Sequence, residues 1–395
     1  MKVLIVSHLY PSPGIERHLF VHEQILALRE LGVETGVLSP TPYTPRVLWR
    51  DPRLKARGQK PLTAARDGVP AEYPRVLQPP RRLLFDRLGD LAYRKVRSLP
   101  SLTSGGYALV HAHQALPDGA LAQRLAADLG VPFVVTVHGA DVYQHLRMGG
   151  ATAARTRAVL SAGGAVMANS SAVARLLADV VSEERLHVVL NGTTGLGRAV
   201  EPAADYLPGE PLVLSVGYLI ERKGLRELIA AAGLLRRRGR PFQLALVGDG
   251  PLKSALQEQA AAEGVADSVH FLGRVPHARV LQLMARAQLF ALPSWDEAFG
   301  LVYTEAMAQG TPVVAGQGEG PEDFIEDGVS GYLVPVRDPE ALAGIIATVL
   351  DDPEAAADMG EAGRAAALAL SWGRNARLTL DVYETVLRGA SSSRP

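Results

Sequence analysis

The sequence predicts an α/β protein with two domains, each built on a parallel β-sheet that helices cover on both faces. Three observations lead to this prediction. The chain has 395 residues, which exceeds one ordinary core and suits two domains. Short β-branched runs alternate with helical patterns from end to end, as parallel sheets require. A stretch rich in Gly and Pro, residues 193–211, interrupts the alternation, and we place a linker there.

In the first half, residues 2–7 are apolar without alternation and predict a buried parallel strand. Residues 15–31 predict a helix, because apolar residues recur at helical spacing and Gly32 follows as a stop signal. Further strands are expected at 33–39, 107–113, 131–139, 165–170 and 187–192, with helices between the strands from 107 onward.

The alternation begins again after the linker. Strands are expected at 212–219, 242–248, 269–273, 289–294, 312–316 and 331–336, with a helical pattern in each gap and two or three more helices at the end. We therefore predict an N-terminal domain over 1–195, a linker over 196–211 and a C-terminal domain over 212–370. A helix with a short tail, 371–395, is expected to cross back to the first domain.

Residues 46–104 depart from the pattern and are expected to form an irregular basic insertion. Within it, 46–97 carries 14 Lys and Arg against 5 Asp and Glu. Its last part, 81–99, has an apolar helical face with basic residues around it. Such a helix lies on an anionic membrane or is a core helix with a solvated basic rim, and the sequence favours neither interpretation.

Composition excludes several classes of protein. The net charge is zero, which argues against a dedicated nucleic-acid-binding protein, and the absence of cysteine excludes disulfides, thiolate zinc sites and cysteine nucleophiles. No run approaches the ~18 apolar residues of a membrane span. We expect a cytoplasmic protein, with attachment to the inner face of the membrane as an open alternative.

The segment "WDEAFGLVYTEAMAQGTPVVAG" (295–316) has the strongest chemical signal. Gly300 falls where a helix over 301–309 should begin, and a helix start with a glycine is suited to an anion. Glu297 lies before that helix and Glu305 within it. Carboxylates beside a phosphate site suit sugar hydroxyl groups, which can donate hydrogen bonds to them. The alternative is a solvated helix start with Glu297 as an N-terminal charge.

Residues 215–229 show the same arrangement, because a buried strand ends at Gly217 and Arg222 and Lys223 precede a helix. Two cations at such a turn suit a diphosphate, although Arg-Lys before a helix is often only surface. Glycine turns also follow the strands at 242–248 and 269–273. Four such turns at successive strand ends of one domain indicate a ligand site more strongly than one.

The first domain offers fewer candidates. His138 ends a strand and precedes a glycine, so it is expected to project toward a ligand, where it could bind a hydroxyl or act as acid or base. Gly14 lies in the first strand-to-helix turn, where the backbone can approach a phosphate. His111 and His113 could ligate a metal, but they have no partner cluster in sequence, and we expect no metal site.

These segments together resemble retaining GT-B glycosyltransferases of family 4, also called group 1. The resemblance is carried by the E-x7-E signature "EAFGLVYTE" and by "SVGYLIERKG", "LVGDGP", "FLGRVPH", "VVTVHGAD" and "GVSGYLVPVRDPEALA" in the family's order. The N-terminal "YPSPGIERHLFVHEQILALRELG" and "VHAHQALPDG" are similar to the branch of teichuronic-acid and exopolysaccharide glycosyltransferases. The second half matches specifically, and 46–104 hardly at all.

The resemblance implies a GT-B fold, in which two Rossmann-like domains face each other across a cleft, the first on the acceptor side and the second binding the donor. The donor would be a UDP- or GDP-sugar, and no metal or other cofactor is expected. The implied site residues are Glu305 on the ribose, Glu297 on the transferred sugar, Arg222 and Lys223 on the diphosphate with the backbone of Phe299, Gly300 and Leu301, Arg274 and Val275 at the base, Gly14 at the diphosphate and His138 by the donor sugar.

The expected reaction is therefore transfer, with retained anomeric configuration, to a cell-surface polysaccharide or glycolipid precursor. The acceptor is a glycan or a lipid-linked glycan, with membrane contact through 81–99 as one interpretation. Two alternatives stay open, an enzyme that makes a small soluble glycoside and a nucleotide-sugar-binding partner without turnover. The second arises because Tyr218 stands where the family usually has arginine. The chain also has Gly14 in place of a glycine pair and "LNGTT" (190–194) in place of "PNGVD".

Overall fold

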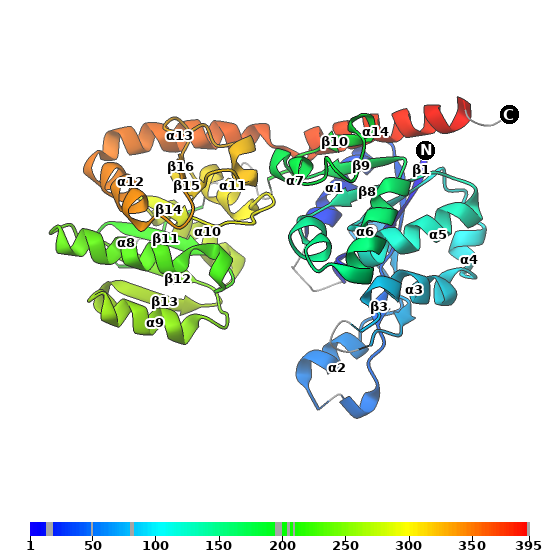
Figure 1. Ribbon diagram of the computed structural model, residues 1–395, viewed down its shortest axis with the longest axis horizontal. Coiled ribbons are helices and arrows are strands. Elements are labelled where there is room, and N and C mark those ends of the chain that lie inside the picture. The colour runs from blue at the N-terminus through cyan, green and yellow to red at the C-terminus, as the bar shows by residue number, and fades with distance from the viewer. Residues whose placement is uncertain are drawn as a thin grey trace. The chain divides into compact units, whose positions relative to one another are not determined.

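The computed structural model describes residues 1–12, 19–48, 50–79, 83–193, 200–203, 206–207 and 210–392. The chain forms two compact units (Figure 1). Unit 1 comprises Met1–Gly192 and Trp372–Pro395, and unit 2 comprises Thr193–Ser371. Both units are built on parallel sheets, as the sequence predicts. Gly14, a predicted donor-binding residue, lies outside the described residues, as do Arg81 and Arg82.

Unit 1 contains an eight-stranded sheet in the order β10-β9-β8-β7-β1-β2-β5-β4. Every pair in it is parallel except β4 with β5, which is antiparallel. The strands are β1 (Lys2–Val6), β2 (Glu34–Leu38), β4 (Thr63–Arg66), β5 (Val69–Glu72), β7 (Leu109–His113), β8 (Phe133–Val137), β9 (Ala165–Ala168) and β10 (Leu186–Val188).

The C-terminal helix completes unit 1. Helix α14 (Trp372–Ser392) packs beside α1 (Leu19–Glu30), where Gln24 Nε2 donates to Asn375 Oδ1 at 2.7 Å. Tyr383 is fully buried, and its hydroxyl lies 2.6 Å from His111 Nδ1 on β7. The remaining helices of this unit are α2 (Pro52–Gly58), α3 (Leu88–Val96), α4 (Pro100–Thr103), α5 (Ala120–Leu129), α6 (Gly150–Ala162) and α7 (Ser171–Arg175).

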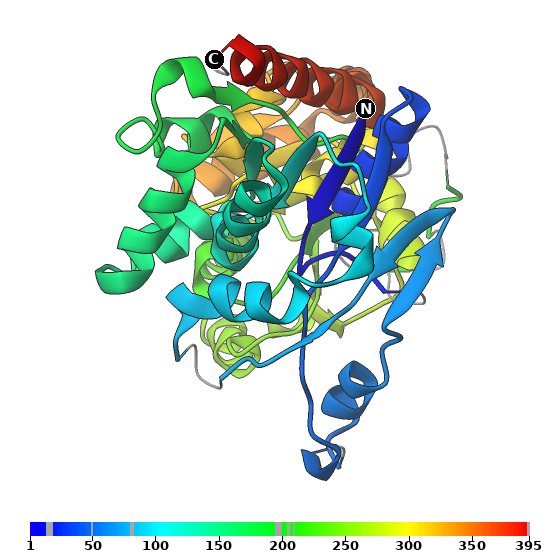
Figure 2. The same cartoon turned by 90° about the vertical axis from the view of Figure 1, so that its right-hand side faces the viewer.

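The insertion 46–104 is more regular than the sequence predicted. Strands β4 and β5 belong to the main sheet, and β6 (Arg75–Val76) pairs with β3 (Thr41–Pro42) in a small second sheet. Figure 2 shows the segment that carries α2 extending away from the main sheet. These strands could not be predicted from the sequence because they are short. Two of them also lie at or near the sheet edge, where few residues are buried and polar side chains are common.

Helix α3 shows whether the apolar face predicted within 81–99 lies in the core or is available to a membrane. Its apolar face is buried in unit 1, where Leu88, Ala92 and Val96 are almost inaccessible. A Cβ added at Gly89 would lie 2.6 Å from the Cβ of Ala120, so α3 and α5 are in close contact. This face is therefore a core face with a basic rim, and it is not free to enter a membrane. Among the helices within the described ranges, none combines the length and apolar character needed to cross a bilayer.

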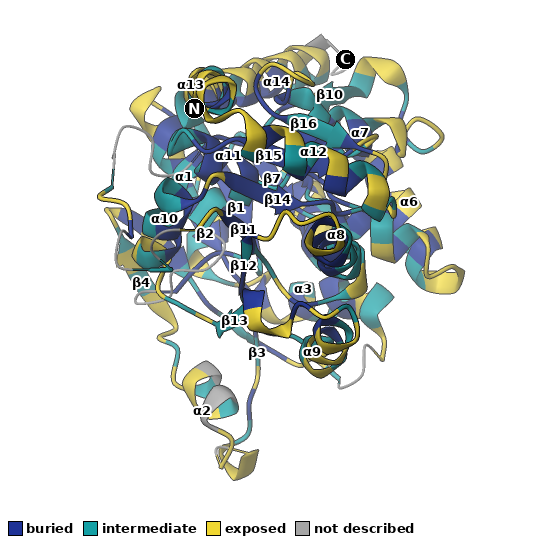
Figure 3. Ribbon diagram, turned by 90° about the vertical axis from the view of Figure 1, so that its left-hand side faces the viewer, coloured by how far each residue is buried: buried dark blue, intermediate teal, exposed yellow. Residues whose placement is uncertain are grey.

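Unit 2 contains a six-stranded, fully parallel sheet in the order β13-β12-β11-β14-β15-β16. The strands are largely buried beneath the helices (Figure 3). They are β11 (Leu212–Val216), β12 (Gln243–Val247), β13 (Val269–Gly273), β14 (Leu289–Leu292), β15 (Val313–Gly316) and β16 (Tyr332–Val334). The helices are α8 (Leu225–Arg237), α9 (Lys253–Ala262), α10 (His277–Arg286), α11 (Leu301–Ala308), α12 (Pro339–Asp351) and α13 (Pro353–Ala369).

The predicted linker 196–211 is only partly described, and its described residues contact unit 2. Ala203 is buried, and its N–H donates to the carbonyl of Gln282 on α10 at 3.0 Å. Arg286 Nη2 donates to the carbonyl of Leu207 at 3.0 Å. The described part of this segment is thus fastened to α10.

Both sheets have a topological switch point. In unit 2 the chain forms β11, adds β12 and β13 on one side, and then returns to place β14 on the other side of β11. In unit 1 it forms β1, adds β2 and β5 on one side, and returns to place β7 on the other. The loops leaving the two strands at such a point diverge and open a crevice, where ligands of open α/β sheets bind.

Candidate functional site

The switch point of unit 2 brings together the two loops that the sequence analysis favoured. The loop after β11 includes the short helical turn Glu221–Lys223, and the loop after β14 includes Trp295–Gly300. Trp295 N–H donates to the carbonyl of Arg222 at 2.9 Å, and Arg222 Nη1 donates to the carbonyl of Asp296 at 3.0 Å. Arg222 thus fastens the two loops to each other.

Lys223 and Glu297 form an ion pair at the centre of this switch point. Lys223 Nζ lies 2.5 Å from Glu297 Oε2, and the two side chains are only 13% and 11% exposed. The hydroxyl of Ser294 donates to the same Glu297 oxygen at 3.3 Å. The Lys223 chain also lies about 3.9 Å from the position of a Cβ at Gly217. Residues 74 positions apart in sequence therefore meet at the edge of one sheet.

Glu319 holds the Glu297 loop from the other side. It follows β15, and its Oε2 accepts the backbone N–H of Glu297 at 2.8 Å. Burial raises the pKa of Glu319 and outweighs this hydrogen bond, and the nearby charges of Asp296 and Glu297 act in the same direction as burial. Asp296, Glu297 and Glu319 thus lie close together beside Lys223, and their carboxylates could accept hydrogen bonds from hydroxyl groups of a ligand.

Gly300 begins helix α11 in a conformation that glycine favours. Its φ is +80°, and a Cβ there would lie 2.4 Å from the ring of Tyr303. The Tyr303 hydroxyl is fixed by the carbonyl of Leu292 at 2.5 Å and by Ser294 Oγ at 2.8 Å. Burial raises the pKa of Tyr303 well above its usual value, so this hydroxyl stays neutral and rigid.

The start of α11 presents unused hydrogen-bond donors. Within the described parts of the chain, no hydrogen bond begins from the backbone N–H of Phe299, Gly300 or Leu301. The Phe299 side chain is buried against Phe324, with ring centroids 5.1 Å apart, so it is not available to a ligand. Free N–H groups and the helix dipole together suit an anion.

Glu305 lies one turn further along α11, and its partner is a residue that the sequence analysis did not assign. His277 Nε2 is 3.1 Å from Glu305 Oε1. His277 begins α10, directly after the loop that contains the exposed Arg274 and the half-buried Val275. The structure therefore brings Glu305 to the loop predicted to frame a base.

The residues missed in unit 2 are Ser294, Glu319 and His277. Glu319 follows a predicted strand, so the rule that ligands bind at carboxyl ends of strands could have indicated it. Nothing in the sequence marks Ser294 or His277, because their role depends on which side chains the fold places beside them.

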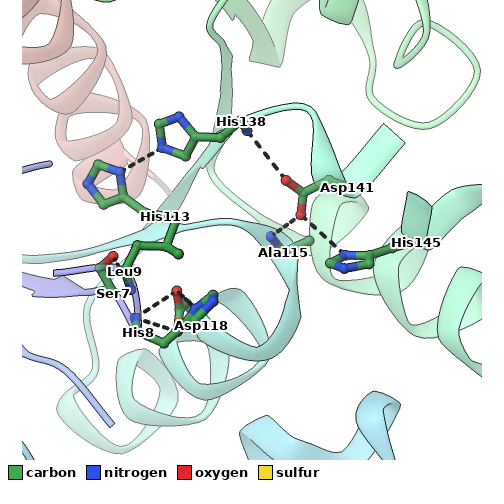
Figure 4. Close-up of polar contacts among 9 residues, drawn as sticks. All are labelled: Ser7, His8, Leu9, His113, Ala115, Asp118, His138, Asp141 and His145. Carbon is green, nitrogen blue, oxygen red and sulfur yellow. Dashed lines mark hydrogen bonds and ion pairs between the residues drawn. The ribbon is translucent and has the colours of Figure 1, made fainter. Parts of the chain in front are cut away.

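His138 in unit 1 lies at the end of β8 among other polar side chains (Figure 4). Its Nε2 is 2.9 Å from His113 Nδ1, and its backbone N–H donates to Asp141 at 3.4 Å. Burial lowers the pKa of His113 well below its usual value, and the neighbouring histidines add to this effect, so His113 is neutral. The sequence analysis missed Asp141, whose other oxygen accepts the N–H of Ala115 at 2.6 Å.

His111 makes structural contacts. Its ring nitrogens lie 2.6 Å from the Tyr383 hydroxyl and 2.7 Å from Thr136 Oγ1, and burial lowers its pKa to about 3. Within the parts of the chain that the structure describes, no three His, Cys, Asp or Glu side chains converge as a metal ion would require. His111 and His113 are both buried, so the "HAH" segment is part of the unit 1 core.

Comparison with known proteins finds a matching glycosyltransferase family for each of the two units. The family described as glycosyl transferases group 1 matches residues 203–366, and glycosyltransferase family 4 matches residues 14–194. A glycogen synthase of Mycobacterium tuberculosis is 30% identical over 427 aligned positions, which cover 100% of this chain and 97% of that protein. A D-inositol 3-phosphate glycosyltransferase of Nocardia farcinica is 31% identical over 321 positions, covering 75% and 70%.

A solved structure has the same fold. The HepE protein of Anabaena in complex with UDP superposes with a TM-score of 0.70 at 20% identity, covering 99% of this chain and 100% of that one. The two parallel-sheet units are accordingly the two Rossmann-like domains of the GT-B fold.

Proposed function

Because the chain belongs to the group 1 glycosyltransferases of family 4, we propose that it transfers a sugar from UDP- or GDP-sugar with retention of anomeric configuration. The proposed acceptor is a cell-surface polysaccharide or glycolipid precursor, as in the teichuronic-acid and exopolysaccharide branch that the N-terminal half resembles. The observation that carries the proposal is the buried Lys223–Glu297 pair at the switch point of unit 2, beside an open helix start.

Lys223, Arg222 and the N–H groups of Phe299, Gly300 and Leu301 would bind the diphosphate. A diphosphate offers Lys223 more charge than one carboxylate does, so donor binding would draw the ammonium group from Glu297. Glu297 is then free to accept hydrogen bonds from hydroxyl groups of the transferred sugar. Until a donor binds, Lys223 and Glu297 would neutralise each other's charge.

Glu305 would bind the ribose hydroxyls, and Arg274 and Val275 would frame the base. His277 would set the position of the Glu305 carboxylate through their hydrogen bond. His138, at the end of β8, would lie by the donor sugar. Gly14 would contact the diphosphate, and its placement is outside the described residues.

The proposed chemistry is a front-side displacement. The bond between the anomeric carbon and the diphosphate breaks, the acceptor oxygen attacks the same face, and the departing diphosphate takes the acceptor's proton. Positive groups of the chain would stabilise the leaving diphosphate, so we propose that no metal is needed. Full transfer activity in the presence of EDTA is the expected result, and loss of activity that Mg²⁺ or Mn²⁺ restores would refute this part.

Two alternatives remain as rivals. The likeness to a D-inositol 3-phosphate glycosyltransferase favours an enzyme that makes a small soluble glycoside. Tyr218, which is 53% exposed where the family usually has arginine, favours a binding partner without turnover.

The proposal of peripheral membrane contact rests on the basic rim of α3. It would be supported if the wild type binds anionic liposomes and the double variant Arg87→Glu, Arg94→Glu does not. Liposome binding unaffected by both changes would contradict it.

The function is tested first by a thermal-shift screen of the full chain against UDP, GDP, ADP and their sugars. A ligand that binds only the folded state raises the melting temperature. We expect one nucleoside diphosphate and its sugar to do so, and sugar transfer to follow with that donor. Stabilisation without transfer to any glycan, lipid-linked or small acceptor would favour the binding partner, and no stabilisation at all would refute the proposal.

A further inference from the structure

The switch point of unit 1 carries a histidine–aspartate pair that has no role in the proposed donor site. His8 follows β1 and Asp118 follows β7, the two strands where the order of the sheet reverses. His8 Nδ1 lies 2.8 Å from Asp118 Oδ2, and the backbone N–H of His8 donates to both carboxylate oxygens at 3.1 Å (Figure 4). Asp118 is buried, whereas the His8 side chain is partly accessible.

The contact with Asp118 sets the tautomer of the neutral imidazole. With Asp118 accepting from Nδ1–H, the Nε2 atom of neutral His8 is left as a hydrogen-bond acceptor. Among the described residues, no hydrogen bond reaches His8 Nε2. Burial lowers the pKa of His8, but the charge and hydrogen bond of Asp118 outweigh it and the pKa is raised. In the neutral form His8 Nε2 accepts a hydrogen bond from a hydroxyl group, and in the protonated form, which the raised pKa favours, it donates one to a hydroxyl oxygen.

His8 and Asp118 line a cavity of about 800 Å³ that lies wholly within unit 1. One wall is made by the loops after β1, β2 and β7, which include Tyr10 and Pro40. A second wall is made by the insertion 46–104, which contributes the apolar side chains of Val76, Leu77, Phe85, Leu88 and Ala92 and the polar side chains of Gln59, Lys60 and Gln78. The cavity therefore combines a polar end at a sheet edge with a wall that is mainly apolar and carries three polar side chains.

The apolar wall continues to the surface. Leu77 lines the cavity and is 67% exposed, and the same insertion exposes Val47, Leu48 and Leu62. A cavity for a free sugar is lined by polar and aromatic groups that serve its hydroxyls, whereas aliphatic side chains that reach the surface suit a chain that enters from outside.

We propose that this cavity binds an amphipathic acceptor, a sugar linked to an aliphatic chain, with one sugar hydroxyl donating to His8 Nε2 and the chain lying along Leu77 and Val76. This inference rests on the proposed function and narrows its acceptor to the lipid-linked class. Lys60 and Gln78 also line the cavity and are placed to serve the acceptor's other polar groups.

The first test measures binding of n-octyl and methyl glycosides of glucose, galactose and mannose to the full chain by calorimetry. If two of the seven additional methylene groups are buried, the octyl glycoside binds about tenfold tighter than the methyl glycoside of the same sugar. Equal affinities, or no binding of either, would overturn the proposal.

Substitutions at Leu77 and His8 test whether the glycosides bind in this cavity. Leu77→Asp places a charge in the wall and should abolish the octyl preference, while Leu62→Asp, an equally exposed leucine (61%) outside the cavity lining, should preserve it. His8→Asn keeps a donor for Asp118 but removes the Nε2 position, and should weaken both glycosides about tenfold. His8→Gln, which restores an atom near that position, should recover part of the loss. Equal effects of the two leucine changes would contradict the assignment.

The two proposals fail in different ways. If the chain binds a nucleoside diphosphate and transfers sugar to acceptors without any octyl preference, the cavity assignment is wrong and the glycosyltransfer proposal stands. If octyl glycosides bind with the preference that Leu77→Asp abolishes, but no nucleotide binds, the donor site in unit 2 is wrong and the cavity assignment stands as a glycolipid site.

Discussion

Replacing Lys223 by methionine separates what the ion pair does for stability from what it does for transfer. The change leaves Glu297 charged and about nine-tenths buried, with Ser294 as its remaining donor. Removing one partner of a buried pair costs about 3–5 kcal/mol. Because Ser294 still donates and some water reaches the site, we expect the lower end, about 3 kcal/mol of unfolding free energy. Glu297→Gln should cost less, since the lysine can turn toward solvent.

Transfer activity should respond differently. Lys223→Met and Glu297→Gln should each reduce kcat/KM by about 10²–10³, the size of one lost electrostatic contact in a transition state. In the double variant neither charge is buried without a partner, so stability should return to within about 1 kcal/mol of the wild type. Transfer should not return, because the diphosphate still lacks its cation.

The assay pairs urea denaturation with product formation from the donor that the thermal-shift screen identifies, for the wild type, both single variants and the double variant. The reasoning is refuted if the double variant regains transfer along with stability, because the pair would then be structural only. It is equally refuted if either single variant transfers sugar within about threefold of the wild type.

Three further predictions concern single positions. Gly300→Ala should destabilise unit 2 by about 1–3 kcal/mol and weaken nucleotide binding, because its φ is positive and its Cβ would overlap Tyr303; urea denaturation and calorimetry test this, and an unchanged variant would contradict it. Tyr218→Arg should strengthen nucleoside diphosphate binding about tenfold by adding a charge-assisted contact, and no gain would show that this side chain lies away from the phosphates. Burial raises the pKa of Asp141 to about 6, so the folded chain keeps a proton that the unfolded chain releases, and about 3 kcal/mol of stability is lost as pH rises from about 4 to about 6. Urea denaturation of Asp141→Asn should show this dependence missing relative to the wild type, and identical slopes would refute it.

The sequence predicted the elements of unit 2 well because its strands are continuous apolar runs followed by glycine turns. It also placed Lys223 and Glu297 at strand ends that proved to be neighbours. It could not show that the two pair with each other, since that depends on the strand order, which puts β14 beside β11. His277 was missed for the same reason, because α10 meets α11 only in the folded sheet.

Unit 1 was harder to predict. The strands at 63–72 are short and partly exposed, so they have no clear pattern, and the insertion was expected to be irregular. The apolar stripe of α3 is real, but periodicity alone cannot say whether a core or a membrane covers it. His8 lies directly after a predicted strand, and yet its significance depends on Asp118, which is 110 residues away.

The central claim is that the switch point of unit 2 binds a diphosphate through Lys223 and the start of α11. Calorimetry with the preferred nucleoside as its monophosphate and as its diphosphate tests this most directly, because the two ligands differ by one phosphate group. The account predicts that the wild type binds the diphosphate at least tenfold tighter, and that Lys223→Met removes most of this difference while binding the monophosphate nearly as before. Equal binding of the two ligands by the wild type, or an unchanged difference in the variant, would contradict it.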